Sequence, residues 1–513
     1  MAVATATGLV GVAQFPTEAV SRRPRPTDPF TLGVASGDPT AHGVVLWTRL
    51  ARQPLAADGL GGMPAADVEV EWEVALDERF RRPVRRGRST ARQHSAHSVH
   101  VDLTGLRPGT EYFYRFRAAG HLSPVGRTRT APGARTVGVP LNLAVTSCAH
   151  LEHGWFNVYR AIAADQPELV VFLGDYVYSR VPGRQEPTPH VRTYAGRPGE
   201  EPSTLADFRL RYAQHRTDPD LRAAHAAAPW LAVLDDHEVQ DNWAADFPSG
   251  DQTREQFLAR RAAAFQAYYE NMPLSRSALP TAAGMRLYRR FGWGGLARFH
   301  LLDTRQYRDD QACGDGYRTD CAAAADPARS ILGADQERWL LDGLARRRPG
   351  WDFLAQQVFF AQRDDDPSPE HRNSNMDYWD GYAACRDRIT RGLVERRVTN
   401  PVVLTGDIHD CWIADIRGDY AAPDSPTVAT ELVTPSVTSS GDGSDRQLTP
   451  DYLRSNPHLR YYGNRRGYLR LRLTPEAASV QVRTVPAVTD PAAVASTAAS
   501  FVIESGRPGV QPG

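Results

Sequence analysis

At 513 residues, the chain is too long for one ordinary hydrophobic core, so two domains are the natural expectation. With 41% hydrophobic and 9% aromatic residues it can bury substantial cores, which excludes an intrinsically disordered protein. Its 60 basic and 60 acidic residues balance to a formal charge of zero, and no apolar run is long enough to span a membrane. Neither a nucleic-acid-specific surface nor a transmembrane segment is therefore expected.

Residues 1–29 precede the first predicted domain. Ala2–Phe15 is small and mildly apolar, like the hydrophobic stretch of an export signal, although no basic segment precedes it. The pair Arg22-Arg23 follows this stretch, which is the wrong side for the arginine pair of a signal. We predict a signal remnant, either because the chain starts inside a longer twin-arginine signal or because the signal was trimmed. The alternative is an ordinary disordered tail.

Residues 30–135 are predicted to form an N-terminal β-sandwich of the immunoglobulin or fibronectin type. Val68–Ala75 and Glu111–Ala118 alternate polar and apolar residues, and His97–Leu103 does so more weakly. Short alternating strands separated by turn residues are typical of two packed antiparallel sheets. The stretch from Arg127 to Pro140, rich in Pro, Gly and Thr, is the predicted linker.

Residues 141–513 have the alternation of strands and helices that is typical of an α/β domain. Phe257–Asn271 and Asp335–Arg347 carry apolar residues at helical spacing. Strand-like alternation returns at Tyr468–Leu473 and Ser479–Val485. We therefore predict an α/β catalytic domain with a C-terminal β-rich segment and with its chemistry on loops.

Four predicted strands of this second domain end in residues that bind metals. Continuous apolar runs suit strands covered on both faces, and ligands gather beyond the carboxyl ends of such strands. The four transitions are Leu-Ala-Val-Thr (143–146) into Ser147-Cys148, Leu-Val-Val-Phe-Leu (169–173) into Gly174-Asp175 and Tyr178, Trp-Leu-Ala-Val-Leu (230–234) into Asp235-Asp236-His237-Glu238, and Val-Val-Leu-Thr (402–405) into Gly406-Asp407-Ile408-His409. We expect their side chains to converge on the multi-metal site of a hydrolase.

The residue types at these strand ends indicate a mixed cluster. A thiolate and a phenolate favour a trivalent or soft ion, whereas Asp236 and Asp407 offer hard oxygen ligands. His409 lies two residues after Asp407, so both side chains point the same way on an extended segment. We predict one iron-like ion beside one or two hard divalent ions. Adjacent cations can clamp a phosphate and lower the pKa of a bridging water into the nucleophilic range.

The five cysteines suggest two roles. Cys313 and Cys321 enclose a short Gly/Asp-rich stretch, which indicates a disulfide-closed loop, with two free loop thiols as the alternative. A disulfide would imply an oxidising compartment. Cys148 stands at a strand end among hard-metal ligands, which favours a ligand over a cysteine nucleophile.

The strand-end motifs also carry a family resemblance. The order Ser147-Cys148, Gly174-Asp175-x-x-Tyr178, Asp235-Asp236-His237-Glu238 and Gly406-Asp407-x-His409 resembles the alkaline phosphatase D (PhoD) family of the metallophosphoesterase group. The likeness extends to Gly33–Pro39, Leu46–Arg49, Leu302–Arg308, Tyr378–Tyr382 and Glu504–Gly509, and so covers nearly the whole chain after residue 30. It implies a metallophosphoesterase-type β-sandwich core flanked by helices.

The resemblance also implies a ligand set. Cys148, Tyr178 and His409 would hold Fe3+, and Asp175 would bridge to Ca2+. Asp236 and Asp407 would hold the calcium side, with a second calcium near the phosphate and other divalent metals as alternatives. Asp235 competes with Asp236 for this role.

Three further residues are candidates for contacting the substrate. His237 and Asn242 would contact the phosphate or the leaving group, with a structural role as the alternative for each. Arg305 would grip a phosphate oxygen, or else brace a loop through an ion pair.

The function predicted from the sequence is that of a secreted or cell-envelope alkaline phosphatase/phosphodiesterase. A metal-bound hydroxide or oxide would attack phosphate mono- and diesters. One alternative is a phospholipase D-type or teichoic-acid-type phosphodiesterase acting on phospholipid or cell-wall polymer, with residues 183–204 and 361–382 shaping the rim. A non-catalytic cell-surface binding protein is a further alternative. An oxidoreductase is disfavoured because no Gly-x-Gly-x-x-Gly follows a strand at a helix start.

Overall fold

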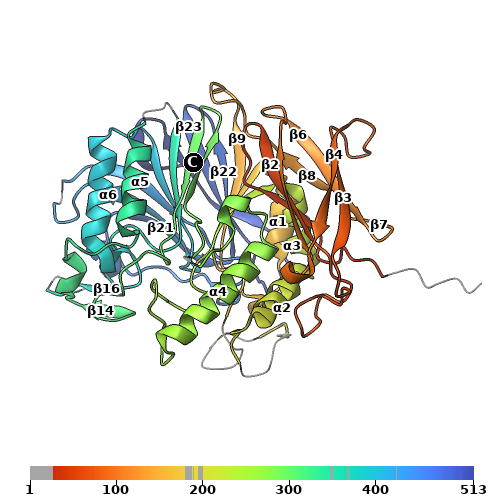
Figure 1. Cartoon of the computed structure of the whole chain (residues 1–513). Helices are drawn as coiled ribbons and strands as arrows, with labels where there is room; N and C mark the ends of the chain where they lie inside the picture. Colours follow the sequence, from red (N-terminus) through yellow and green to blue (C-terminus); the bar gives the residue numbers. More distant parts are fainter. Residues whose placement is uncertain are drawn as a thin grey trace, which may run out of the picture.

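Two large mixed β-sheets pack face to face in the computed structural model of the chain, with helices on their outer faces (Figure 1). The structure describes residues 27–179, 188, 190–193, 200–282, 284–346, 350–366, 368, 370–422 and 424–513. The signal predicted at the N-terminus and most of the rim segment 183–204 lie outside these residues. None of the described helices is long and apolar enough to cross a membrane.

The first sheet has ten strands and contains three of the four strands that precede the predicted metal ligands. Its order is β25 (Arg507–Pro512), β24 (Ser496–Glu504), β23 (Ala477–Thr484), β22 (Gly467–Leu473), β9 (Leu141–Thr146), β10 (Leu169–Leu173), β11 (Pro229–Val233), β1 (Val34–Gly37), β2 (Gly43–Arg49) and β5 (Ser98–Thr104). Strands β9, β10, β11 and β1 run parallel, so β9, β10 and β11 end at one edge of the sheet.

The second sheet has eight strands and contains the fourth of these strands, β17. Its order is β12 (Arg289–Trp293), β13 (Ala297–Leu301), β15 (Trp351–Gln356), β17 (Pro401–Thr405), β19 (Thr427–Val433), β18 (Cys411–Arg417), β21 (Leu459–Arg465) and β20 (Gly443–Ser444). Strands β13, β15, β17 and β19 are parallel. The apolar faces of both sheets share one buried core, which includes Val145, Val171, Val233 and Leu404.

Helices cover the two outer faces of this sandwich, as expected for an α/β domain. On the first sheet lie α1 (Asn157–Asp165), α2 (Leu205–Arg216), α3 (Pro219–Ala227) and α4 (Arg254–Asn271), and on the second lie α5 (Gly333–Leu344) and α6 (Ala383–Glu395). The remaining short elements are α7 (Pro450–Ser455), the two-stranded sheet β14 (Tyr317–Thr319) with β16 (Asn373–Asn375), and the 3-10 turns η1 (Gln93–Ser95), η2 (Leu151–His153), η3 (Arg276–Ala278), η4 (Ala322–Ala325) and η5 (Trp379–Tyr382).

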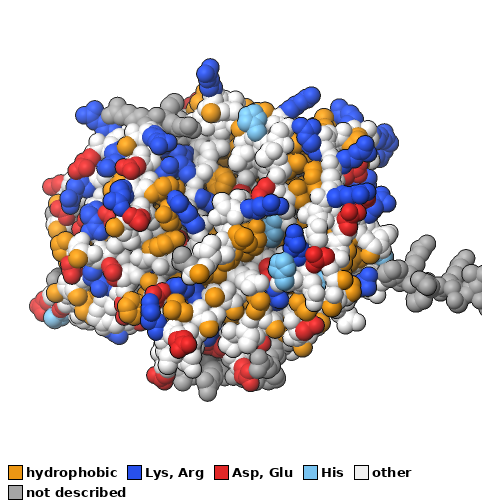
Figure 2. All heavy atoms as spheres, viewed as in Figure 1, with side chains coloured by type: hydrophobic (Ala, Val, Ile, Leu, Met, Phe, Trp, Pro, Cys, Tyr) orange, Lys and Arg blue, Asp and Glu red, His pale blue; other side chains and the backbone are white. Residues whose placement is uncertain are grey.

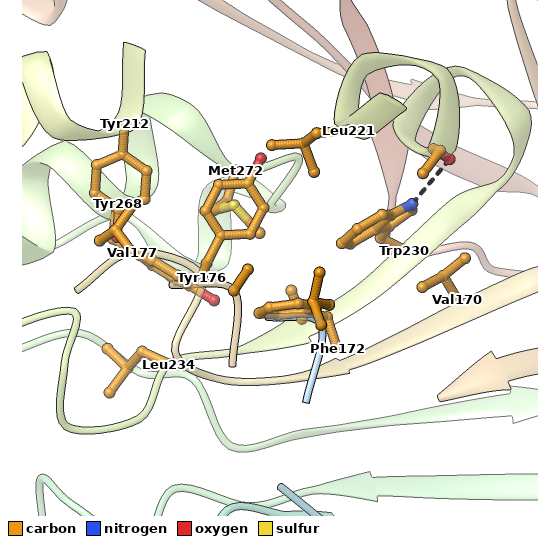
Figure 3. Packing of buried hydrophobic residues seen from close by; sticks show 14 of the residues in the cluster. Val170, Phe172, Tyr176, Val177, Tyr212, Leu221, Trp230, Leu234, Tyr268 and Met272 are labelled. Carbon is orange, nitrogen blue, oxygen red and sulfur yellow. Dashed lines mark hydrogen bonds between the residues drawn. The ribbon is translucent and has the colours of Figure 1, made fainter. Parts of the chain in front are cut away.

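Aromatic side chains fill the layer between the first sheet and its helices (Figure 3). The rings of Phe172 on β10 and Trp230 on β11 stack with their centroids 5.5 Å apart. The indole of Trp230 donates a hydrogen bond to the carbonyl of Ala224 in α3 at 3.3 Å. Tyr176, just after β10, packs edge-on against Phe172 at 5.5 Å. This packing fixes the strand ends that lead into the predicted site.

In the N-terminal region, where a β-sandwich is predicted over 30–135, two sheets pack against each other, and one of them extends into the rest of the chain. Strands β4 (Pro83–Ala91), β3 (Val68–Ala75), β6 (Glu111–Ala118), β7 (His121–Leu122) and β8 (Gly126–Arg129) form a separate sheet that packs against β1, β2 and β5. The latter three, however, continue the ten-stranded sheet, because β1 pairs in parallel with β11. Strand β8 also occupies the start of the predicted linker. The alternation in the sequence showed the strands but not their partners, which long-range pairing decides.

Charged side chains of both signs are interspersed over the face shown in Figure 2.

The disulfide expected within the Gly/Asp-rich loop is present between Cys313 and Cys321, with an S–S distance of 2.09 Å. The other three cysteines are buried and free.

Candidate metal centre

The loops after β9, β10, β11 and β17 meet at one edge of the sandwich. The backbone N–H of Cys148 donates to the carbonyl of Gly174 at 3.1 Å, which ties the first two loops together. A Cβ at Gly406 would lie 2.8 Å from the carbonyl oxygen of Leu173, so glycine lets the β17 loop approach β10. The two sheets therefore deliver their strand-end residues to the same place.

Four of the predicted ligands have left-handed backbones. The φ angles are 59° for Cys148, 58° for Asp175, 60° for Asp407 and 68° for His409. Such conformations cost on the order of 1–3 kcal/mol each and cluster at functional sites, where the surrounding structure holds them in place. These left-handed residues turn the chain after β9, β10 and β17, so that their side chains face the site. Asp407 and His409 therefore do not lie on the extended segment predicted from the sequence.

All six predicted metal ligands lie together in the structure. The Cys, His and carboxylate ligand atoms lie within 4.8 Å of one another in three overlapping groups, which are Cys148–Asp175–His409, Asp175–Asp236–His237 and Asp235–Asp236–Asp407. The hydroxyl of Tyr178 joins the first group, 2.9 Å from Asp175 Oδ2 and 3.0 Å from His409 Nε2. Asp175 belongs to two groups, which is the position expected of a bridging carboxylate.

The charge of this cluster fits a cation. Six carboxylates (Asp175, Asp235, Asp236, Glu238, Asp377 and Asp407) face two buried arginines, Arg305 and Arg308. Burial and neighbouring carboxylates hold the pKa values of Asp175 and Asp407 well above their usual range. Asp235 Oδ2 is buried without a hydrogen-bond partner among the described residues. A bound cation would neutralise this excess and supply the missing partner, so the donor set fits metal ions.

The pH dependence of stability offers a test of this charge excess. Burial raises the pKa of Asp235 to about 7 and that of Glu238 to about 8, whereas carboxyls of an unfolded chain titrate near about 4. The folded metal-free protein therefore holds more protons than the unfolded chain between these values. This contribution to stability is fully present below about pH 4 and is lost as the pH rises through 7 to 8.

We accordingly expect the melting temperature measured in chelator to fall between about pH 6 and about pH 9. Added cations should abolish the fall because they favour ionised carboxylates. Melting curves recorded by circular dichroism across this interval provide the measurement. A melting temperature that rises with pH in chelator would contradict the charge excess.

Arg305 lies beneath the carboxylates, with a fully buried side chain. Its Nε donates to Asp235 Oδ1 at 2.6 Å, and its Nη1 donates to both oxygens of Asp377 at 2.8 and 2.9 Å. Its Nη2 lies 3.7 Å from Asp236 and 3.5 Å from Asp407. Of the two roles considered for Arg305, this geometry favours bracing the site over gripping a phosphate. Arg305 engages only Oδ1 of Asp235, so Asp235 and Asp236 both stay candidate ligands.

His237 and Asn242 lie on the loop after β11. His237 Nε2 is 3.6 Å from Asp241 Oδ1, and its backbone N–H donates to Asp175 Oδ1 at 3.3 Å. The backbone N–H of Asn242 donates to Asp236 Oδ2 at 2.8 Å, while its side-chain nitrogen lies 3.1 and 3.0 Å from the two oxygens of Asp315. Because a carboxylate only accepts, the amide nitrogen of Asn242 faces Asp315 and its carbonyl oxygen faces away.

Asp315 lies inside the loop closed by Cys313 and Cys321, so the disulfide loop orients Asn242. We expect Asp315→Ala to lower kcat/KM by about tenfold, because a hydrogen bond to a charged acceptor is worth about 1.5 kcal/mol. Steady-state kinetics measure this effect, with the exposed Asp326→Ala as the control from the same region. A kcat/KM for Asp315→Ala that equals that of the control would show that Asn242 needs no such support.

Some residues at the site were not assigned a role from the sequence. Glu238 belongs to the Asp-Asp-His-Glu motif, but the sequence did not show that it holds two loops together. Its carboxylate accepts hydrogen bonds from the backbone N–H groups of Asp175, Tyr176 and Asp235 at 3.1, 2.5 and 2.8 Å. The acidic pair Asp235-Asp236 before it was the feature of the sequence that could have pointed to this role. Asp377, which pairs with Arg305, directly precedes the family motif Tyr378–Tyr382, but no sequence pattern pointed to its pairing.

Comparisons with known proteins agree with this geometry. The model of the PhoD-like phosphatase family matches residues 143–482, and that of the PhoD-like phosphatase N-terminal domain matches residues 16–132. Alkaline phosphatase D of Bacillus subtilis (strain 168) is 45% identical over 485 residues, covering 94% of this chain and 82% of the relative. A solved structure described as the structure of PhoD superposes with a TM-score of 0.91 at 44% identity, covering 95% of this chain and 92% of that one.

Proposed function

The chain belongs to the PhoD-like phosphatase family and is a phosphoric ester hydrolase, and from this premise we propose that it is a metal-dependent enzyme acting on both phosphate mono- and diesters. The observation that carries the proposal is the convergence of six ligand-type side chains from four strand ends: five of them belong to three overlapping groups of ligand atoms, and the Tyr178 hydroxyl lies at hydrogen-bonding distance from two of these five.

The proposed metal centre has two halves. Cys148, Tyr178 and His409 would hold Fe3+, since thiolate and phenolate suit a trivalent or soft ion. Asp236 and Asp407 would hold Ca2+ through hard oxygen atoms, and Asp175 would serve both halves. When bound, the cations neutralise phosphate charge and acidify water.

The protein groups around the metals have separate tasks in this proposal. Asp175 accepts hydrogen bonds from the Tyr178 hydroxyl and the His237 backbone, which holds both loops against the site. The imidazole of His237, whose Nε2 lies 3.6 Å from Asp241 Oδ1, would give a proton to the leaving alkoxide. Arg305 would keep Asp235, Asp236 and Asp407 in place from below.

Export to an oxidising compartment is part of the proposal. The Cys313–Cys321 disulfide suits such a compartment. The twin-arginine route is a prediction from the sequence and concerns residues outside those described. Phospholipid and cell-wall polymer as substrates likewise stay predictions, because the rim segment 183–204 lies mostly outside the described residues.

Substrate profiling tests the proposed function. The protein is stripped with chelator and reloaded with iron and calcium, and hydrolysis of p-nitrophenyl phosphate and bis-p-nitrophenyl phosphate is followed at alkaline pH. We expect turnover of both esters in the reloaded protein and of neither in the stripped one. Turnover that is equal before and after stripping would refute metal dependence.

A further inference from the structure

A serine-rich loop lies against Cys148, Tyr178 and His409. This serine loop, Ser436-Val437-Thr438-Ser439-Ser440-Gly441, follows β19 and leads toward β20. Its backbone binds two of the ligand loops: Val437 N–H donates to the carbonyl of Ser147 at 3.0 Å, and Ser436 N–H donates to the carbonyl of His409 at 3.2 Å. The loop therefore joins the end of β9 to the end of β17.

The hydroxyl of Ser439 contacts two of the proposed ligands. Its single hydroxyl proton is shared between two acceptors, the Tyr178 hydroxyl oxygen at 2.6 Å and the carbonyl oxygen of Cys148 at 2.9 Å. Ser439 is fully buried, so no water competes for these contacts. A hydroxyl that is fixed on both sides in this way sets the position of the Tyr178 oxygen relative to the Cys148 backbone.

The hydroxyl of Ser440 contacts the third proposed ligand. Its Oγ lies 2.9 Å from His409 Nδ1, while His409 Nε2 faces Tyr178 at 3.0 Å. If the serine oxygen accepts the Nδ1 proton, the lone pair of Nε2 points into the group formed with Cys148 and Asp175. A metal-binding histidine is commonly oriented through its other ring nitrogen in this manner.

The serine loop is itself held in place from below. Arg466, which is fully buried, donates from Nη1 to the carbonyls of His409 and Ser439 at 2.6 and 2.8 Å and to Ser436 Oγ at 3.0 Å. The Ser436 hydroxyl donates to the carbonyl of Ser439 at 2.9 Å. These contacts make one rigid unit of the loop and the His409 backbone, which a positioning role requires.

We propose that Ser439 and Ser440 are positioning residues for metal binding, which orient the Tyr178 hydroxyl and the His409 ring before a cation enters. The inference rests on the proposed metal centre. It assigns the serines no contact with substrate and no contact with the metals. Their effect should appear in the retention of the ions, since partners of this kind typically change metal affinity or activity by about 10–100-fold.

The variants separate the effect of the serine hydroxyls from the effect of backbone strain. Ser440 has a φ of 67°, so alanine would add strain, whereas Ser440→Gly removes the hydroxyl without it. Ser440→Asn tolerates this conformation and returns an acceptor oxygen. Ser439→Ala removes the buried hydroxyl. Ser444→Ala, on the exposed strand β20, is the matched control.

The readout is the rate at which chelator removes metal from the full-length protein, followed by elemental analysis of the protein after each interval. We expect Ser439→Ala and Ser440→Gly to lose metal at least about tenfold faster than wild type, and Ser440→Asn and Ser444→Ala to stay near wild type.

The outcomes keep this inference distinct from the proposed function. If wild type retains metal but Ser439→Ala or Ser440→Gly releases it within twofold of the wild-type rate, the inference is overturned and the metal centre stands. Release from Ser440→Asn as fast as from Ser440→Gly also overturns it, because the acceptor would then be irrelevant. A wild-type protein that takes up no metal refutes the proposed function and the inference with it.

Discussion

Asp175→Asn should abolish turnover while leaving a folded protein. The side chain keeps its shape but loses the negative charge with which it would bind the cations of both groups to which it belongs. Loss of several kcal/mol of metal-dependent transition-state stabilisation lowers kcat by at least about 10³-fold. Metal content per chain should fall as well. Steady-state kinetics and elemental analysis measure both effects.

The same variant should not destabilise the protein in chelator. Burial and the carboxylates of Asp236 and Asp235 raise the pKa of Asp175, which means that a negative charge at this position is unfavourable without metal. The neutral amide of asparagine avoids this charge. Its melting temperature without metal should equal or exceed that of wild type, as is common where function opposes stability. The control is Asp342→Asn on an exposed position of α5. An Asp175→Asn protein with near-normal turnover would show that Asp175 is no ligand.

Arg305→Met should be among the most destabilising single changes at the site. The substitution leaves Asp235 buried without its cation and removes one of the two arginines that pair with Asp377. Breaking a buried ion pair from one side costs about 3–5 kcal/mol of unfolding free energy. Urea denaturation in the presence of metals measures the loss.

A double variant tests the origin of this loss. Arg305→Met with Asp235→Asn removes both partners of the pair that Arg305 makes with Asp235, so it should recover part of the stability lost in Arg305→Met alone. If Arg305 instead binds substrate phosphate, Arg305→Met would raise KM and leave the unfolding free energy unchanged. That result would restore the phosphate-gripping role considered from the sequence.

The local structure and the ligand types were predictable from the sequence because both depend on nearby residues. Val68–Ala75 alternates in polarity and is β3, and the apolar run at 402–405 lies within β17. Ligand-type residues follow such buried parallel strands at their carboxyl ends, so their meeting place follows from topology. The resemblance to the PhoD family, confirmed by the comparisons, rests on these same motifs.

Residues that act across long sequence distances were not predictable in the same way. The pairing of β1 with β11, which joins the N-terminal strands to the catalytic sheet, has no local signature. Arg305 and Asp377 are 72 positions apart and meet only through folding. Ser439 and Tyr178 are separated by 261 positions, and a Ser/Thr run in a loop is a common turn signal rather than a sign of metal binding.

The most direct test of the metal centre is elemental analysis of the protein purified without chelator. We expect about one iron and one or two calcium ions per chain, as the thiolate, phenolate and carboxylate donors imply. A protein that carries neither metal, and that stays inactive after both are added back, would contradict the proposed metal centre.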